Sequence, residues 1–154
     1  MPLPPGVEIA GEALAALAPA DRAWLRDGLA RVLRTAGIPV ARLAIEVVHD
    51  ARMRLLHARH MGLDSTTDVL TFAQSAPGEA VDADVAVCAD EASRRGEGTA
   101  HGARGELLLY ALHAVLHAAG HDDRDEASYA RMHAEEDRIL EAAGFGRIFE
   151  GGAK

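Results

Sequence analysis

The chain has 154 residues, of which 49% are hydrophobic and 26% charged, and its formal net charge is −8 at pH 7. This composition predicts a globular protein with one core and excludes a disordered chain, and no apolar run reaches the ~20 residues of a membrane span. The acidic balance argues against broad, nonspecific binding of nucleic acids, which favours a basic surface.

The first half of the chain predicts alternating strands and helices. Residues Val7 to Ile9 form a short candidate strand, and Pro19 to Ala36 carry apolar residues at helical spacing. Residues Arg42 to Val48 alternate and are rich in β-branched residues, as in a strand. Asp50 is placed to cap the amino end of a helix over Ala51 to His60.

The second half begins with two further strands and a short helix. Thr67 to Phe72 and Asp84 to Cys88 are predicted as strands, and Asp90 to Arg95 as a helix. Gly96 to Gly102 contains three glycines and is predicted to be a loop. Cys88, the single cysteine, is assigned to the sheet core; it excludes an internal disulfide and fits a reducing compartment such as the cytoplasm.

Two long helices complete the chain. The helix Arg104 to Ala119 is apolar almost all round, which predicts that it is buried at the centre of the domain. The last helix, Asp125 to Ala143, has an apolar stripe of Tyr129, Met132, Ile139 and Leu140. We therefore predict one α+β domain over residues 1–154, with a mixed sheet of about four strands, about five helices, and flexible ends at 1–6 and 150–154.

Two histidines lie four residues apart on the predicted central helix. This spacing places the imidazoles of His113 and His117 on one helix face, roughly 6 Å apart along the axis, where both can bind one metal ion. An unpaired polar group on a buried helix costs on the order of 1 to 3 kcal/mol. A metal site is therefore favoured over two histidines that merely belong to the core.

The residues after Gly120, which ends this helix, offer a third ligand. Asp123 follows the glycine at the spacing of metal sites in which His-x3-His precedes x2-Gly-x2 and a His or Asp, and we expect it to be the ligand. His121 remains the alternative. Two histidines and one carboxylate leave a position for water, whose pKa bound zinc lowers toward ~7, and harder divalent metals also suit a carboxylate.

The residue directly after His113 decides which chemistry is expected. Metallopeptidases with a His-Glu-x-x-His helix use the glutamate as general base, whereas this chain has Ala114 at that position. Ordinary peptidase activity is therefore disfavoured. Phosphodiesters fit better, because a metal can polarise a phosphoryl oxygen and RNA can offer its own 2′-hydroxyl.

Three segments together resemble a known family. The run from His113 to Asp123 resembles the metal motif of the YbeY-type endoribonucleases, whose third ligand is usually histidine. The segment Thr67 to Phe72 is similar to that family's Thr-Asp-Val-Leu-Ser-Phe strand, and Asp84 to Val87 to its Gly-Asp-Ile-x-Ile strand. The order and spacing of the three segments agree over about residues 41 to 143.

The resemblance implies a zincin-like fold, one bound zinc and cleavage of single-stranded RNA. It implies roles in 16S rRNA 3′-end maturation and ribosome quality control, with ribosomal RNA and the small subunit as partners and no role for DNA or membranes. His113, His117 and Asp123 would hold the metal. No catalytic residue is assigned beyond a metal-bound water, and Arg59 and Asp68 are weak candidates for that role.

The chain also departs from the family pattern. His60 and Met61 stand where the family often has Tyr-Arg, so a phosphate-contacting arginine is missing there and Arg59 is a candidate substitute. His121 stands where tyrosine is usual. Two alternatives therefore stay open: a noncatalytic ribosome-associated protein whose metal staples the helix to the next loop, and a metallohydrolase acting on another class of substrate.

Overall fold

The core of the molecule is a four-stranded mixed sheet. The structure is a computed structural model that describes residues 1–121 and 124–146. The sheet has the order β1-β2-β4-β3 and consists of β1 (Val7–Ala10), β2 (Val40–Val48), β3 (Val69–Ala73) and β4 (Val81–Cys88). β1, β2 and β4 run parallel, while β3 pairs with β4 antiparallel. β3 is therefore an edge strand, and its outer side pairs with no strand of the described residues.

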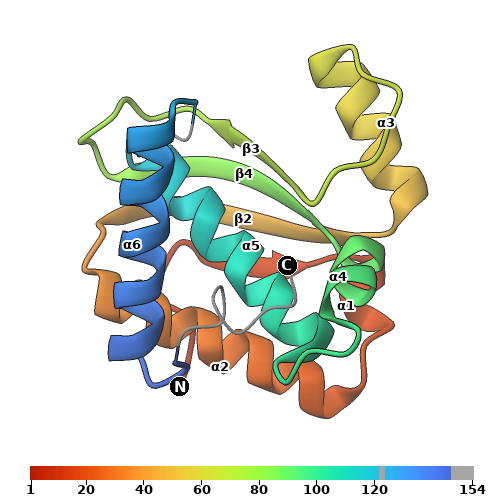
Figure 1. Cartoon of the computed structure of the whole chain (residues 1–154), viewed down its shortest axis with the longest axis horizontal. Coiled ribbons are helices and arrows are strands. Elements are labelled where there is room, and N and C mark those ends of the chain that lie inside the picture. The colour runs from red at the N-terminus through yellow and green to blue at the C-terminus, as the bar shows by residue number, and fades with distance from the viewer. Residues whose placement is uncertain (122–123, 147–154) are drawn as a thin grey trace.

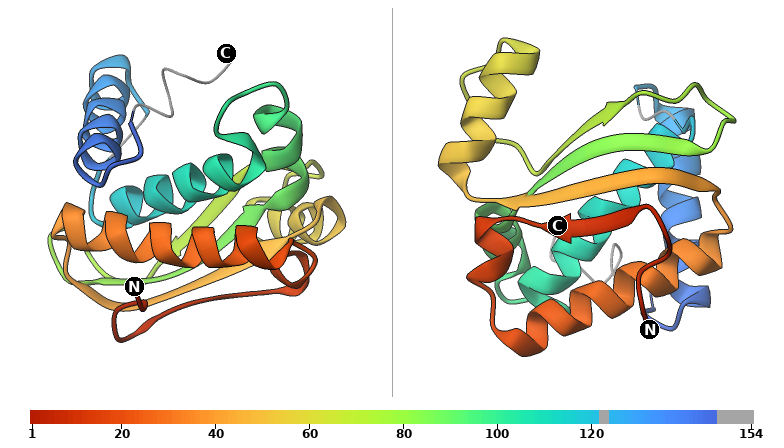
Figure 2. Two further views of the ribbon diagram at one scale, coloured as in Figure 1. Left: turned by 90° about the horizontal axis from the view of Figure 1, so that it is seen from below. Right: turned by 180° about the vertical axis from the view of Figure 1, so that it is seen from behind.

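Helices cover one face of this sheet in two layers. The described residues form α1 (Glu12–Ala15), α2 (Pro19–Ala36), α3 (Asp50–Met61), α4 (Ala89–Gly96), α5 (Gly102–Ala118) and α6 (Glu126–Ala142). α2 and α5 lie against the sheet, and α6 lies on the outer side of this helical layer (Figures 1 and 2). Among these helices, none is both long and apolar enough to cross a bilayer.

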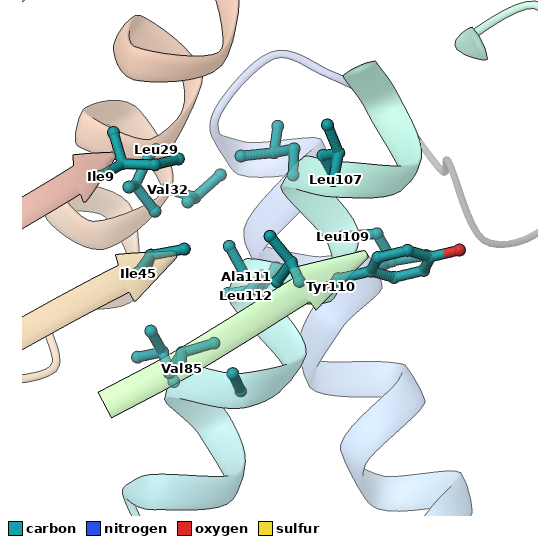
Figure 3. Close-up of a cluster of buried hydrophobic side chains, with 14 of the residues drawn as sticks. Ile9, Leu29, Val32, Ile45, Val85, Leu107, Leu109, Tyr110, Ala111 and Leu112 are labelled. Atoms are coloured by element: carbon teal, nitrogen blue, oxygen red, sulfur yellow. The ribbon is translucent and has the colours of Figure 1, made fainter. Parts of the chain in front are cut away.

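The main core lies between the sheet and α2 and α5. Strand side chains such as Ile9, Ile45 and Val85 meet Leu29 of α2 and Leu112 of α5 (Figure 3). All five are at most 3% exposed. α5 thus runs through the interior, as its nearly continuous apolar sequence predicts.

The opposite face of the sheet is only partly covered. α3 packs there against the end of the sheet through a smaller cluster that includes Met53, Leu56 and Leu70. The helix projects beyond the strands, and the rest of this face has no helix over it (Figures 1 and 2). The carboxyl end of α3 consequently reaches the edge strand β3, which matters for the site described below.

The α+β class and the mixed four-stranded sheet are confirmed, and every predicted strand and helix is present within a few residues. The short helix α1 was not predicted. Its four residues are too few for a periodic pattern, and it is held by burial of Ala13 and Leu14. The expected flexible segment 150–154 lies outside the described residues, and flexibility of residues 1–6 stays a prediction.

Two local predictions were wrong. Asp50 does not cap α3 but is its first residue, and its own backbone N–H donates to Asp90 Oδ2 at 2.7 Å. Its carboxylate instead accepts two hydrogen bonds from Arg94 of α4. Tyr129 does not belong to the buried stripe of α6, because it is exposed and stacks on His133 with 3.9 Å between ring centroids.

Candidate metal centre and substrate cleft

α5 exposes two side chains along most of its length, and both are histidines. From Gly105 to Ala118 every residue is buried except His113, which is half-buried, and His117, which is exposed. They are four positions apart in the sequence, so both lie on the same face of the helix. The only solvent-accessible face of this part of α5 is therefore the face that carries the two histidines.

Both histidines line a cleft beside the edge strand. The cleft has a volume of about 340 Å³ and is lined by His60, Met61, Val69, Leu70, Thr71, Phe72, His113 and His117. Its walls come from the end of α3, from β3 and from α5. The His60 ring lies on Phe72 with 4.6 Å between centroids. Among the described residues the lining contains no carboxylate, so these side chains add no negative charge that would repel an anionic substrate.

A buried carboxylate holds one of the two imidazoles. Nδ1 of His113 lies 2.7 Å from Oε2 of Glu136, a residue of α6 whose side chain is 0% exposed. Hydrogen bonding of a histidine's second ring nitrogen to a carboxylate is the usual support for a metal-binding imidazole. The residues present therefore fit a cation site, with His113 held in place by α6.

The carboxyl end of α5 turns the chain back at Gly120. The N–H of Gly120 donates to the His117 carbonyl at 3.1 Å, and the N–H of His121 donates to the Leu116 carbonyl at 3.0 Å, which is the Schellman pattern. Gly120 has φ +116°, and a Cβ there would lie 3.0 Å from Pro77 Cβ. Only glycine fits this position. Asp123, the expected third ligand, lies outside the described residues.

The structure places the two weak candidates away from the centre of the cleft. Asp68 pairs with Arg95 of α4 at 3.0 Å and accepts a hydrogen bond from the N–H of Val69. It therefore supports the start of β3. Arg59 is exposed near the end of α3, next to the cleft-lining His60, but is not itself among the lining residues.

A second group of possible ligands lies elsewhere. Asp50, Cys88 and Asp90 each have a potential ligand atom within 4.8 Å of the others. A cationic side chain already satisfies this group, because Arg94 donates to both Asp50 oxygens at 2.8 Å and lowers the pKa of that carboxyl well below its usual range. Burial raises the pKa of the Cys88 thiol, which disfavours the thiolate that binds metals.

A larger groove of about 530 Å³ lies over the uncovered part of the sheet. The carboxylates of Glu8, Glu46 and Asp84 line it, and the last two pair with Arg52 and Arg42 respectively. His60 and Phe72 also border the cleft, so the two hollows meet at this pair of rings. The groove contains neither His113 nor His117. The smaller cleft is therefore the better candidate for a site that binds phosphodiesters.

A family model described as endoribonuclease YbeY matches residues 16–144. The chain belongs to this family. The matched range contains the whole cleft and Glu136. YbeY sequences from two bacteria support the assignment: the Frankia alni protein is 34% identical and the match covers 66% of this chain, and the Nocardioides protein is 31% identical and the match covers 68%.

The relatives are longer than the matched region. The match covers 76% of the Nocardioides YbeY protein, 63% of the Frankia protein and 64% of the Mycolicibacterium paratuberculosis protein, so the chain spans less than two thirds of the last two. Among solved structures, the protein TM1509 from Thermotoga maritima superposes with a TM-score of 0.57, covering 88% of this chain and 89% of that one. At 22% identity it supports the fold alone.

Glu136 is the residue of this site that the sequence prediction missed. The pattern did contain a signal, because Glu136 falls on the same helical stripe as Met132, Ile139 and Leu140, which are all 0% exposed. A lone glutamate on the buried stripe of a helix requires a polar partner. The identity of that partner depends on how α6 packs on α5, which local spacing does not reveal.

Proposed function

We propose that this chain is a metal-dependent endoribonuclease that cleaves single-stranded RNA. It acts in the cytoplasm in maturation of the 16S rRNA 3′ end and in ribosome quality control, with ribosomal RNA and the small subunit as partners. The observation that carries the proposal is that α5, otherwise buried from Gly105 to Ala118, exposes only His113 and His117 and does so into the cleft beside β3. Membership of the YbeY endoribonuclease family supports the assignment.

The donor set fits zinc. His113 and His117 supply two imidazoles, and we assign the third position to Asp123, with His121 as the alternative. Zinc bound there would polarise a phosphoryl oxygen and make hydroxide available at neutral pH. His113 would bind through Nε2, because Nδ1 is engaged by Glu136. This open set of three ligands is typical of catalytic rather than structural zinc.

The composition of the cleft favours a phosphodiester over a peptide. Ala114 follows His113 and is 0% exposed, so no carboxylate from this position can serve as general base. The described lining residues also contain no acidic group, unlike the groove over the sheet. An anionic substrate can therefore enter the cleft without meeting a carboxylate of these described lining residues.

The decisive experiment measures cleavage of a fluorescent single-stranded RNA by purified protein, with and without a chelator. We expect cleavage that the chelator stops and that the substitution His117→Ala abolishes. His49→Ala is the matched control, since His49 is an exposed histidine that pairs with Asp90 and does not line the cleft. Equal cleavage by wild type and His117→Ala would refute the proposal.

Metal content tests the ligand assignment separately. Elemental analysis of protein purified without added metal should show zinc in the wild type and less in Asp123→Ala, with no change in His121→Ala. The reverse result would move the third ligand to His121. Wild-type protein that retains zinc but leaves RNA intact would instead support the noncatalytic, metal-stapled protein, and cleavage of another substrate class would support a different metallohydrolase.

A further inference from the structure

We propose that Glu136 is a positioning residue that fixes the ring of His113 as the Nδ1–H tautomer and so directs the Nε2 lone pair to a cation. The part of this inference that concerns metal rests on the proposed function. The part that concerns the tautomer depends only on the contact between α5 and α6.

The contact is short and isolated from solvent. Oε2 of Glu136 lies 2.7 Å from Nδ1 of His113, and the glutamate side chain is 0% exposed. Its other oxygen, Oε1, has no hydrogen-bond partner among the described residues. A buried carboxylate is acceptor-only, so a hydrogen bond from Nδ1–H is the interaction that stabilises it. The neutral ring then carries its lone pair on Nε2.

Packing alone does not account for a glutamate at this position. Its neighbours on the stripe, Met132, Ile139 and Leu140, are apolar and equally buried. A leucine would fill the same helix face without the cost of desolvating a carboxylate. Replacing buried ionic groups with apolar side chains is often neutral or stabilising, so the charge has a role other than filling space.

The two histidines of the cleft differ in whether a hydrogen bond holds the imidazole ring. His117 is exposed, and its ring makes no hydrogen bond with the residues that the structure describes. His113 is oriented before any cation binds, and the carboxylate makes its imidazole a stronger donor to a cation. The site thus combines one ligand with a fixed orientation and one that can adjust.

The first test reads the tautomer in metal-free protein. Long-range 1H–15N spectra of histidine side chains, recorded at mildly alkaline pH, should show His113 in the Nδ1–H form. The substitution Glu136→Leu removes the acceptor and should shift His113 toward the Nε2–H form that free imidazole side chains favour. The matched control is Glu135→Leu, because Glu135 is the adjacent residue of α6 but bonds to Arg138.

The second test measures zinc affinity by competition with a chromophoric chelator. We expect Glu136→Leu to weaken binding roughly 10- to 100-fold, the usual effect of removing such a partner. Glu136→Gln keeps an acceptor oxygen but loses the charge, so its affinity should fall between those of Glu136→Leu and the wild type. Glu135→Leu should bind zinc as the wild type does.

The outcomes separate this inference from the proposed function. If Glu136→Leu leaves both the tautomer and the zinc affinity unchanged, Glu136 is only structural and the inference is overturned. The same conclusion follows if Glu136→Leu is unfolded and Glu136→Gln binds zinc like the wild type. Wild-type protein that shows the expected tautomer and zinc affinity but does not cleave RNA would overturn the proposed function and leave this inference standing.

Discussion

The two histidines of the cleft should differ sharply in what they contribute to stability. His113→Ala leaves the fully buried carboxylate of Glu136 without its hydrogen bond, whereas His117→Ala removes an exposed ring. Leaving a buried carboxylate without its partner costs about 3 to 5 kcal/mol. Exposed substitutions away from such contacts usually change stability by about 0.5 kcal/mol or less. We therefore expect only the first variant to be strongly destabilised in metal-free protein.

This difference can be measured by thermal denaturation in excess chelator, followed by circular dichroism. For a chain of this size, 1 kcal/mol shifts Tm by roughly 2 to 4 °C, so His113→Ala should melt about 6 to 20 °C below His117→Ala. Adding Glu136→Leu to His113→Ala should recover most of the loss, because no buried carboxylate remains. Equal stability of the two single variants would refute the reasoning that the buried pair stabilises the fold.

Three further predictions concern the end of α5, its buried face and the acidic range of pH. Gly120→Ala should cost about 1 to 3 kcal/mol in chemical denaturation, more than Gly37→Ala, because Gly37 also has positive φ but open space around it. Ala114→Glu should destabilise by several kcal/mol rather than create a peptidase, since position 114 is fully buried; a stable variant would contradict this. Arg94 lowers the carboxyl pKa of Asp50. The pair therefore stabilises the folded protein above the unfolded pKa of about 3.8, and this stabilisation is lost as the pH falls below that value. Arg94→Ala should therefore make stability fall less steeply in acid, and an unchanged acid profile would contradict this expectation.

Local spacing was sufficient to predict the helix and the two histidines of the site. His113 and His117 are related by helical periodicity within one element, and the apolar residues around them indicate burial. The strand that borders the cleft was likewise found from its β-branched and aromatic residues, though it begins at Val69 rather than at Thr67. Both features depend on residues that are close in the sequence.

The parts that were missed depend on contacts between distant elements. Asp50 has the residue type and position of a helix cap, but Arg94 and Asp90 lie more than 35 residues away and change its role. Glu136 meets His113 only because α6 folds back across α5. The sequence shows which residues share a face of α5 and which share a face of α6. It does not show how the two helices pack, and so it does not show that these faces meet.

The cleft also implies how strongly RNA binding should respond to salt. No arginine or lysine lines it within residues 1–121 and 124–146, and Met61 stands where the family often has arginine. Arg59 and Arg54 are both exposed on α3 and form no ion pair among the described residues, but only Arg59 adjoins the lining residues His60 and Met61.

Each phosphate contact on a single strand contributes about 0.7 to the slope of log affinity against log salt. If Arg59 contacts a phosphate, Arg59→Ala should reduce that slope by about 0.7, and Arg54→Ala should leave it unchanged. Equal effects of the two substitutions would mean that α3 attracts RNA only through its general charge and that Arg59 does not replace the missing arginine.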